Sequence, residues 1–233
     1  MAYIGMRKPI IAKITERVDG SAITYDTPIV VGPAVMANVS YNIADNPDMG
    51  DDVIIDNDKG INGYTITLET NDVCIEAKIA ALNYQALVDE DNNNAVIGYR
   101  ITDAEPNEVG CGFIRVKMFR GVRSYEAFFY HALRFSSGGD NASTKQQQIQ
   151  WNHPTLNGTG IGCYLDDSGE AVWFDYMEFS EEDGGEGAAE EWIYGMFGAE
   201  VPATEQSATP AAGGGSSGGS TPPAEGGGSS GGT

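Results

Sequence analysis

The residues whose types and spacing come closest to a chemical site lie between Asp58 and Glu69. Over these positions the chain has a carboxylate first, an asparagine fifth, a glycine sixth and a carboxylate twelfth, which is the order found in helix–loop–helix calcium loops. The third position is Gly60, which has no side-chain oxygen, and the flanking residues have the composition of strands. The pattern therefore favours a turn into the following strand, with Gly60 and Gly63 at positive φ, over a calcium site.

The other candidates for catalysis are two histidines and two pairs of adjacent acids. His131 and His153 lie in stretches with strand composition, where a place in a core or an interface is favoured over metal binding. The acids at 51–52 and 181–182 have the surroundings of solvated loops and not of a tuned acid–base pair. The sequence has no phosphate-binding glycine loop and no metal-binding histidine or cysteine motif. We therefore expect that the protein is not an enzyme and has no catalytic, cofactor-binding or metal-binding residues.

Size, charge and cysteines limit the function further. A chain of 233 residues can bury a core without disulfide bonds. The net charge is −21 and no lysine or arginine follows Lys145, which argues against tight binding of nucleic acid, although an acidic wall can let DNA slide past. Cys74, Cys111 and Cys163 have the spacing of neither a metal site nor a disulfide set, so we expect reduced, buried thiols. No stretch has the composition of a signal peptide or a membrane span, which predicts a soluble protein.

Most elements that must position these residues are predicted to be strands. The stretches share Ile, Val, Thr, Tyr or Phe and are bounded by Gly, Asn or Asp. We expect strands at 9–16, 28–39, 63–70, 111–120, 124–135, 145–152 and 171–179. Between the second and third of these, residues 40–62 have the composition of a long acidic loop.

Two helices are predicted beside the strands. The first spans 72–82, because its apolar residues follow helical spacing, and Thr70, Asn71 or Asp72 is expected to cap it. A second, shorter helix is expected at 188–194, where acids occupy the first turn.

The end of the chain has a different composition. From about residue 201 it consists mainly of Gly, Ser, Thr, Pro and Ala, and the heptamer Gly-Gly-Gly-Ser-Ser-Gly-Gly occurs at 213–219 and again at 226–232. Such a sequence cannot bury enough apolar surface to order itself. We therefore expect a β domain over 1–198 and a disordered tail over 199–233.

The clearest hairpin is predicted around Gly121. On its first arm, apolar residues alternate with Arg115 and Lys117, so one face is apolar and the other basic. The second arm, 125–135, is apolar on both faces. A strand that is apolar on both faces is expected either in the core of a sandwich or at a subunit interface.

Several stretches, in this order and spacing, resemble the major tail proteins of long-tailed phages (siphophages), in particular the phi13 or TP901-1 type. The resemblance covers roughly residues 1–197. The matching stretches are Tyr3-Ile4-Gly5-Met6-Arg7-Lys8-Pro9, Asp56-Asn57-Asp58-Lys59-Gly60-Ile61-Asn62-Gly63, Gly110-Cys111-Gly112-Phe113-Ile114-Arg115-Val116, Ser124-Tyr125-Glu126-Ala127 and Thr144-Lys145-Gln146-Gln147-Gln148-Ile149. The acidic, Gly/Ser-rich end of the chain departs from the family.

The resemblance implies a mainly β fold: a β-sandwich or barrel of the tail-tube type with one flanking α-helix, a long extended loop and a disordered C-terminal tail. It implies a structural virion protein, made in the host cytoplasm, that forms stacked hexameric rings. Subunit sheets would join into a β-lined tube through which DNA is ejected without specific binding. The implied partners are the protein itself and other tail proteins: the tape measure, tail terminator and distal tail proteins. No membrane partner is implied.

Two expectations concern assembly. The 40–62 loop is the best candidate for an arm that reaches the next ring, because it carries the apolar triplet 53–55 in an otherwise charged stretch. The basic residues Arg115, Lys117, Arg120 and Arg123 would be partners for the acidic loop of a neighbour. An alternative function stays open, namely a carbohydrate- or surface-binding β-sandwich module with a flexible C-terminal linker. An unrecognised hydrolase that uses acid pairs is the least favoured interpretation.

Overall fold

The computed structural model describes residues 2–17, 23–50, 53–90, 92, 94–137, 153–163 and 170–202, with only the backbone described at 46–50 and 53–58. By its internal contacts the chain divides into the units Met1–Val201 and Pro202–Thr233. The predicted strand at 145–152 and most of the predicted tail lie outside the described residues. All the described helices and strands belong to the first unit.

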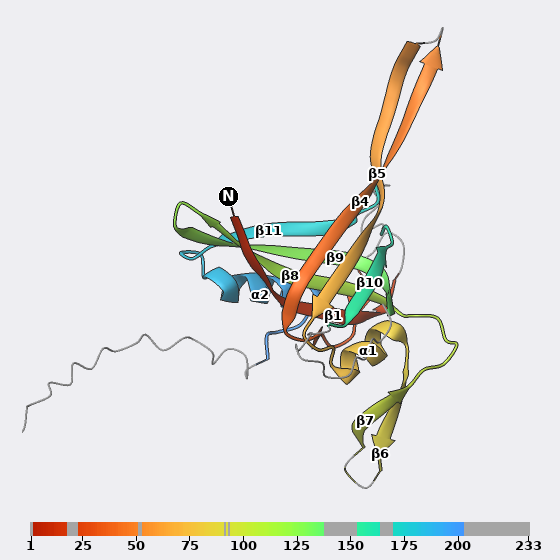
Figure 1. The fold of residues 1–233 in the computed structure, drawn as a ribbon, viewed down its shortest axis with the longest axis vertical. Helices are drawn as coiled ribbons and strands as arrows, with labels where there is room; N and C mark the ends of the chain where they lie inside the picture. The colour runs from red at the N-terminus through yellow and green to blue at the C-terminus, as the bar shows by residue number, and fades with distance from the viewer. Residues whose placement is uncertain are drawn as a thin grey trace, which may run out of the picture. The chain divides into compact units, whose positions relative to one another are not determined.

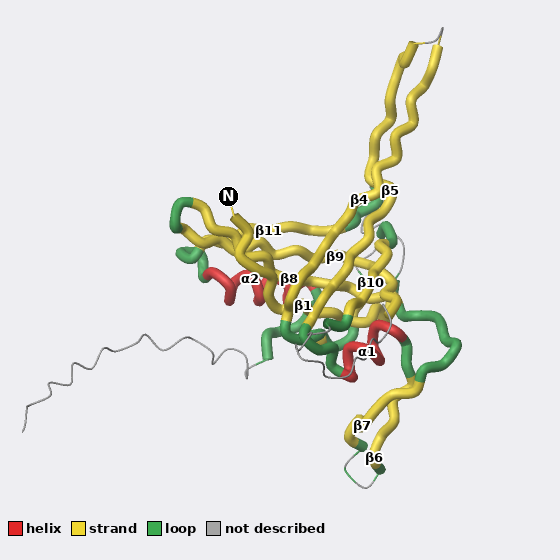
Figure 2. Tube along the Cα trace, in the orientation of Figure 1, coloured by secondary structure: helices red, strands yellow, loops and turns green. Residues whose placement is uncertain are grey.

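The described part of this unit is mainly β, with two helices, which confirms the predicted fold class (Figures 1 and 2). The strands are β1 (Ala2–Glu16), β2 (Thr24–Tyr25), β3 (Ile29–Val30), β4 (Ala34–Gly50), β5 (Val53–Thr70), β6 (Gln85–Asp89), β7 (Ala95–Arg100), β8 (Glu108–Phe119), β9 (Val122–Ser137), β10 (Thr155–Gly160) and β11 (Phe174–Ser180). The helices are α1 (Ile75–Leu82) and α2 (Gly185–Met196).

One large antiparallel sheet contains nearly all of these strands. Its order is β2-β1-β8-β9-β10-β5-β4, with β11 also paired to β9 and β3 to β1. Beyond Tyr130 the partner of β9 changes from β11 to β10, so the sheet divides into two branches at this point. β6 and β7 form a separate two-stranded sheet.

The sheet is covered on both faces where β8 and β9 run together. On one face α2 packs on Ile114, Val116 and Phe129 through Ala189, Ile193 and Phe197, which follow helical spacing. Gly112 allows this close approach, because a Cβ there would lie 2.4 Å from Cγ2 of Ile193. On the other face, side chains of β5, β9 and α1 form the second cluster, which includes Tyr64, Ile66, Ala77, Tyr130 and Leu133.

The prediction that the second arm of the Gly121 hairpin is apolar on both faces is therefore confirmed. The side chains that cover both faces belong to the same subunit. Phe129 and Tyr130 point to opposite clusters, and both are almost completely buried. A position in the core of the subunit therefore accounts for this strand.

The prediction of a loop at 40–62 is wrong. β4 and β5 pair from Ala34↔Thr70 out to Gly50↔Val53, and the hairpin projects beyond the body of the unit (Figure 1). The Asn, Asp, Pro and Gly content suggested a loop, yet Pro47 is tolerated because β4 is an edge strand and β5 its only ladder partner in the described residues. Gly63 has φ 151° where the register shifts, as predicted, whereas Gly60 does not have positive φ.

Both helices predicted from the sequence are present, with shifted bounds. α1 begins at Ile75, and its cap is Cys74, whose Sγ accepts from the Ala77 backbone N–H. Thr70, Asn71 and Asp72 are not the cap, because the chain is still extended there and the Asn71 N–H donates to the Pro33 carbonyl. α2 is longer than predicted, since Gly184 and Gly185 turn the chain into it at positive φ.

Candidate functional site

Four antiparallel strands, β1, β8, β9 and β11, form a section of the sheet with an open edge on each side. β1 pairs with β8, and its other edge meets β3 and β2 only from Ile10 onward in the described residues. β11 pairs with β9 along its length and with no other strand in the described part. Exposed apolar side chains lie at both edges: Tyr3 (57%) and Ile4 (48%) on β1, Tyr176 (45%) and Met177 (43%) on β11. An open apolar edge is a template for pairing with another chain.

The face of this section opposite α2 carries an ion-pair network across three strands. Glu126 of β9 is 3% exposed and accepts from Arg115 Nε at 2.6 Å. Lys117 Nζ lies 3.3 Å from Glu126 and 3.1 Å from Glu178 of β11. The hydroxyl of Tyr176 lies within hydrogen-bond distance of both carboxylates, at 3.3 Å from Glu126 and 3.2 Å from Glu178, and can donate to either. Because each charge has a partner, this buried carboxylate is stabilised within the subunit.

Hydrogen bonding sets the protonation of this network. Hydrogen bonds from Ser124 and then Lys117 lower the pKa of the Glu178 carboxyl. Partial burial and the neighbouring carboxylates raise the pKa of Tyr176 to about 12. Both groups therefore keep their hydrogen-bonding form at neutral pH, which fits a structural role.

Two of the four basic residues of this hairpin have ion-pair partners within the subunit. Arg115 and Lys117 are occupied by Glu126 and Glu178 of the same chain. Arg120 and Arg123, at the turn between β8 and β9, have no ion-pair partner among the described residues. Arg120 lies over the Phe119 ring, and Arg123 makes a side-chain hydrogen bond with Tyr125.

A groove lies between β4 and this sheet face. It encloses about 230 Å³. The hydroxyls of Tyr41 and Tyr130 face each other at 3.3 Å, and burial raises the pKa of Tyr130, so its hydroxyl stays protonated. Arg115 lies over the rings of Tyr3 (4.2 Å) and Phe128 (4.7 Å). The lining offers apolar and aromatic surface with no general base beside a nucleophile. It consists of Met6, Ala37, Asn38, Val39, Tyr41, Phe113, Arg115, Phe128 and Tyr130.

The β4–β5 arm, defined as residues 42–63, exposes apolar side chains. Ile43 and Ile61 are opposite each other in the ladder and are 66% and 43% exposed. Next along the arm, the Lys59 Nζ lies 3.1 Å from Asp45 across the strands. The apolar triplet 53–55 belongs to β5, but its side chains lie outside the described residues. The arm therefore leaves two large apolar side chains in contact with water within the described subunit.

The calcium pattern does not become a calcium site within one chain. Asp58 and Glu69 both lie in β5, which is extended throughout, so their backbones are about 36 Å apart at about 3.3 Å per residue. Among the described residues, no group of three His, Cys, Asp or Glu side chains is arranged to hold a metal ion.

The two histidines lie in different surroundings. His131 is 4% exposed, and its Nε2 lies 2.9 Å from Asp175 Oδ2 of β11. Burial lowers the pKa of the imidazole, and the nearby Asp175 opposes this effect only in part. The predicted core position of His131 is therefore confirmed. His153 is half-buried just before β10.

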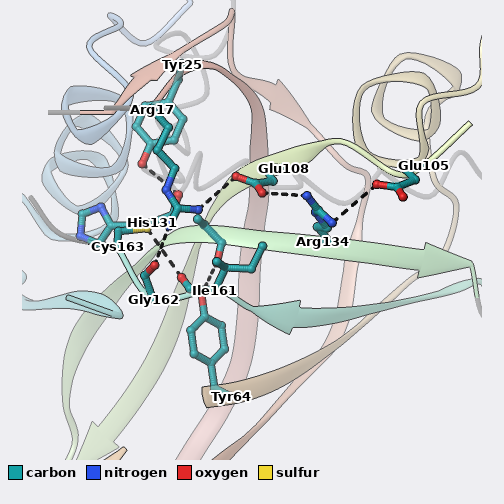
Figure 3. A network of polar contacts seen from close by, with 11 residues as sticks. Arg17, Tyr25, Tyr64, Glu105, Glu108, His131, Arg134, Ile161, Gly162 and Cys163 are labelled. Carbon is teal, nitrogen blue, oxygen red and sulfur yellow. Dashed lines mark hydrogen bonds and ion pairs between the residues drawn. The ribbon is translucent and has the colours of Figure 1, made fainter. Parts of the chain in front are cut away.

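A network of polar contacts surrounds His131 (Figure 3). The register between β8 and β9 shifts here, so His131 and Ala132 both stand opposite Gly110. The bulge exposes two carbonyls to the interior, and two tyrosines satisfy them: Tyr25 donates to the His131 carbonyl and Tyr64 to the Ala132 carbonyl, each at 3.0 Å. These hydroxyls hold the strand backbone in place.

Beside the bulge, Glu108 joins two arginines. Its carboxylate lies 3.1 Å from Arg17 and 2.9 Å from Arg134, and Arg17 also donates to the Gly162 carbonyl at 2.7 Å (Figure 3). The contacts tie the end of β1 to β8, β9 and the segment after β10. The polar cluster therefore joins segments that are distant in sequence.

The cysteines are free thiols, as predicted. Cys111 and Cys163 are buried, and burial raises the pKa of Cys111 to about 12. Cys74 differs from the prediction, because it is only half-buried and caps α1.

Sequence reasoning missed the buried Glu126, although a signal was present. A two-residue turn at Arg120-Gly121 pairs Phe119 with Val122, and the same register places Arg115 opposite Glu126. Asp175 had no comparable signal, because the partner strand of β11 is far from it in sequence.

Comparison with known proteins gave no family: no family model matches the sequence, and no curated protein matches it significantly. Within the described residues, neither helix is long and apolar enough to cross a membrane.

Proposed function

We propose that this protein is the major tail subunit of a long-tailed phage, a structural virion protein that polymerises as stacked hexameric rings. The rings would form the tube through which DNA is ejected. The observation that carries the proposal is the four-stranded section β1-β8-β9-β11, which has an apolar open edge on each side.

The two edges are suited to joining copies in a ring. Successive strands of the section are antiparallel, so β1 and β11 run in opposite directions. If a second copy is related by a rotation that keeps the strand direction, its β1 lies antiparallel to β11 of the first. Such contacts use two different surfaces, and they form a ring when the rotation between neighbouring copies closes. The number six comes from the family resemblance in the sequence.

The arm supports stacking of the rings. It projects from the body and exposes the pair Ile43 and Ile61, which another copy can cover. Contact with a copy in the next ring would bury this pair and explain why an edge hairpin is so long.

The charge fits the passage of DNA. A net charge of −21 repels phosphates, so a lumen built from this chain would not retain the duplex. The further partners would be the tape measure, tail terminator and distal tail proteins, and the site of action would be the virion after assembly in the host cytoplasm.

The experiment that tests the proposal is negative-stain electron microscopy of the purified chain at high concentration, with and without tail-tip seeds. Hollow tubes or six-fold rings are expected. Small monodisperse particles under both conditions would contradict the proposal. If such particles also melt at a lower temperature when calcium is chelated, the result would favour the surface-binding module.

A double variant tests the edges. Ile4→Lys with Met177→Lys places a charge at each open edge, which is a common way to prevent pairing between sheets. We expect a folded subunit that forms neither rings nor tubes. The matched control is Thr65→Lys, an exposed position on a strand paired on both sides, which should assemble normally. Normal assembly of the double variant would show that the edges are not the contact.

A further inference from the structure

The tip of the β8–β9 hairpin, defined as Phe119–Arg123, combines exposed apolar and basic side chains. Phe119 and Val122 are paired across the turn and are 46% and 65% exposed. Arg120 and Arg123 flank them and have no ion-pair partner in the part of the chain that the structure describes. In a chain with 34 acids and 13 bases, a tip with two arginines and no acid stands out.

Arg120 occupies an unfavourable backbone conformation. It has φ 50° and Gly121 has φ 83°, which is the pattern of a type I′ turn. Asn or Gly at the first position of such a turn avoids the steric penalty that arginine has there. The guanidinium lies over the Phe119 ring at 5.2 Å, at the outer end of the hairpin. Strain of this kind at an exposed charged residue points to a binding role.

The β6–β7 hairpin has the opposite character. It is a separate two-stranded sheet, which in water is marginally stable by itself. Leu87, Val88, Val96 and Ile97 are 38%, 45%, 36% and 64% exposed. Near its turn the hairpin carries Asp89 and Glu90, and Glu90 has no ion-pair partner among the described residues. Apolar residues on both faces of a strand indicate that something covers it.

The two hairpins of one chain cannot meet. The β8–β9 tip and the β6–β7 hairpin extend from different ends of the unit (Figure 1). α1 and the segment 101–107 lie between β6–β7 and the large sheet in the chain order.

We infer that the β8–β9 tip of one copy docks on the β6–β7 hairpin of a second copy, with Arg120 and Arg123 facing Glu90. The two surfaces are complementary in charge and each has exposed apolar residues to bury. The contact joins two different surfaces, so it is head-to-tail, as a ring or tube requires. This inference rests on the proposed function and names a contact between its subunits.

Disulfide cross-linking tests the contact directly. Full-length Val122→Cys is mixed with full-length Ile97→Cys carrying a tag of different size, oxidised at high concentration and run on a non-reducing gel. A mixed dimer is expected, since both positions are exposed and the native cysteines are buried or half-buried. The matched control mixes Val122→Cys with Thr65→Cys and should give none. A yield no higher than in the control would overturn the contact.

Charge reversal tests the pairing. Arg123→Glu on the cysteine-bearing tip, or Glu90→Arg on the cysteine-bearing hairpin, should each lower the rate of cross-linking about tenfold, because an attraction becomes a repulsion. Mixing the two charge-reversed chains with each other should restore the rate of cross-linking. Equal rates in all four mixtures would contradict the assignment of these charges. Glu16→Arg, at an exposed acid outside both hairpins, is the control and should have no effect.

The readouts separate this inference from the proposed function. Cross-linking without tubes in the microscope would support the contact and contradict the tail-tube proposal. Tubes that form from wild-type and reversed chains alike, with no cross-link, would support the tail tube and overturn the contact.

Discussion

Strand β9 and the β4–β5 arm are both parts of long hairpins, but they are stabilised in different ways. In β9, nearly every side chain from Tyr125 to Leu133 is buried, because α2 covers one face and the β5/α1 cluster the other. In the arm, cross-strand hydrogen bonds continue while the described side chains, Ile43 and Ile61 among them, face solvent. The subunit therefore stabilises β9 by packing on both faces, whereas the described part of the arm is stabilised mainly by its cross-strand hydrogen bonds. Substitutions in the two regions should differ accordingly.

The largest effect on stability is expected from Phe129→Ala. Phe129 is fully buried, and its ring packs edge-to-face on Phe197 and Tyr25 at centroid distances of 4.7 and 5.7 Å. Loss of the ring leaves a cavity and should lower the free energy of unfolding by about 3–5 kcal/mol. Urea denaturation measures this change in the free energy of unfolding. The control Phe119→Ala removes a ring that is 46% exposed and should cost less than about 1 kcal/mol. Similar losses for both variants would contradict the assigned core.

A smaller effect is expected from His131 at low pH. Burial lowers the pKa of its imidazole in the folded state below that of the unfolded chain. The resulting stability is present above the unfolded pKa of about 6.5 and is lost as the pH falls through the folded pKa. Melting temperatures at pH 7 and pH 5 should therefore differ less for His131→Gln than for wild type. An unchanged pH dependence in His131→Gln would show that other groups cause it.

The smallest effect on subunit stability is expected from the arm. Ile43→Ser with Ile61→Ser removes two exposed side chains and should change the free energy of unfolding by less than about 1 kcal/mol. The same variant should nevertheless stop tube growth, which electron microscopy detects. The matched control is Val35→Ser with Met36→Ser, at two exposed positions of β4 near the body of the unit. Normal tubes from the arm variant would show that the arm does not join rings.

Composition predicted the parts of the fold whose side chains are buried within the chain. β9 is recognisable because most residues from 125 to 135 are apolar, and α1 because its apolar residues follow helical spacing. The signal for α2 is the acids in its first turn. The apolar residues that these elements bury are covered within one subunit.

The parts that sequence did not predict have other causes. The composition of the arm, rich in Asn, Asp, Pro and Gly, predicts a loop. Its two strands nevertheless pair with each other through the backbone ladder of β4 and β5, which does not depend on side-chain propensity. β6 and β7 lack an alternating pattern because both faces are apolar. β10 contains Thr155-Leu156-Asn157-Gly158-Thr159-Gly160, in which the glycines make room for Leu133, Phe135 and Tyr64. The need for glycine there is visible only when those side chains are in place.

The pairing of β1 with β8 has a consequence for biosynthesis. Ile11 lies opposite Cys111, so a ribosome must add about a hundred residues after β1 before its main partner strand exists. At about 5–20 residues per second this takes roughly 5–20 s, during which Ile10 and Ile11 can pair with β3 but not yet with β8. Non-local strand pairing of this kind is slow and exposes the nascent chain to aggregation. We therefore expect the yield of folded subunit to depend on chaperones and on growth temperature more than its final stability suggests.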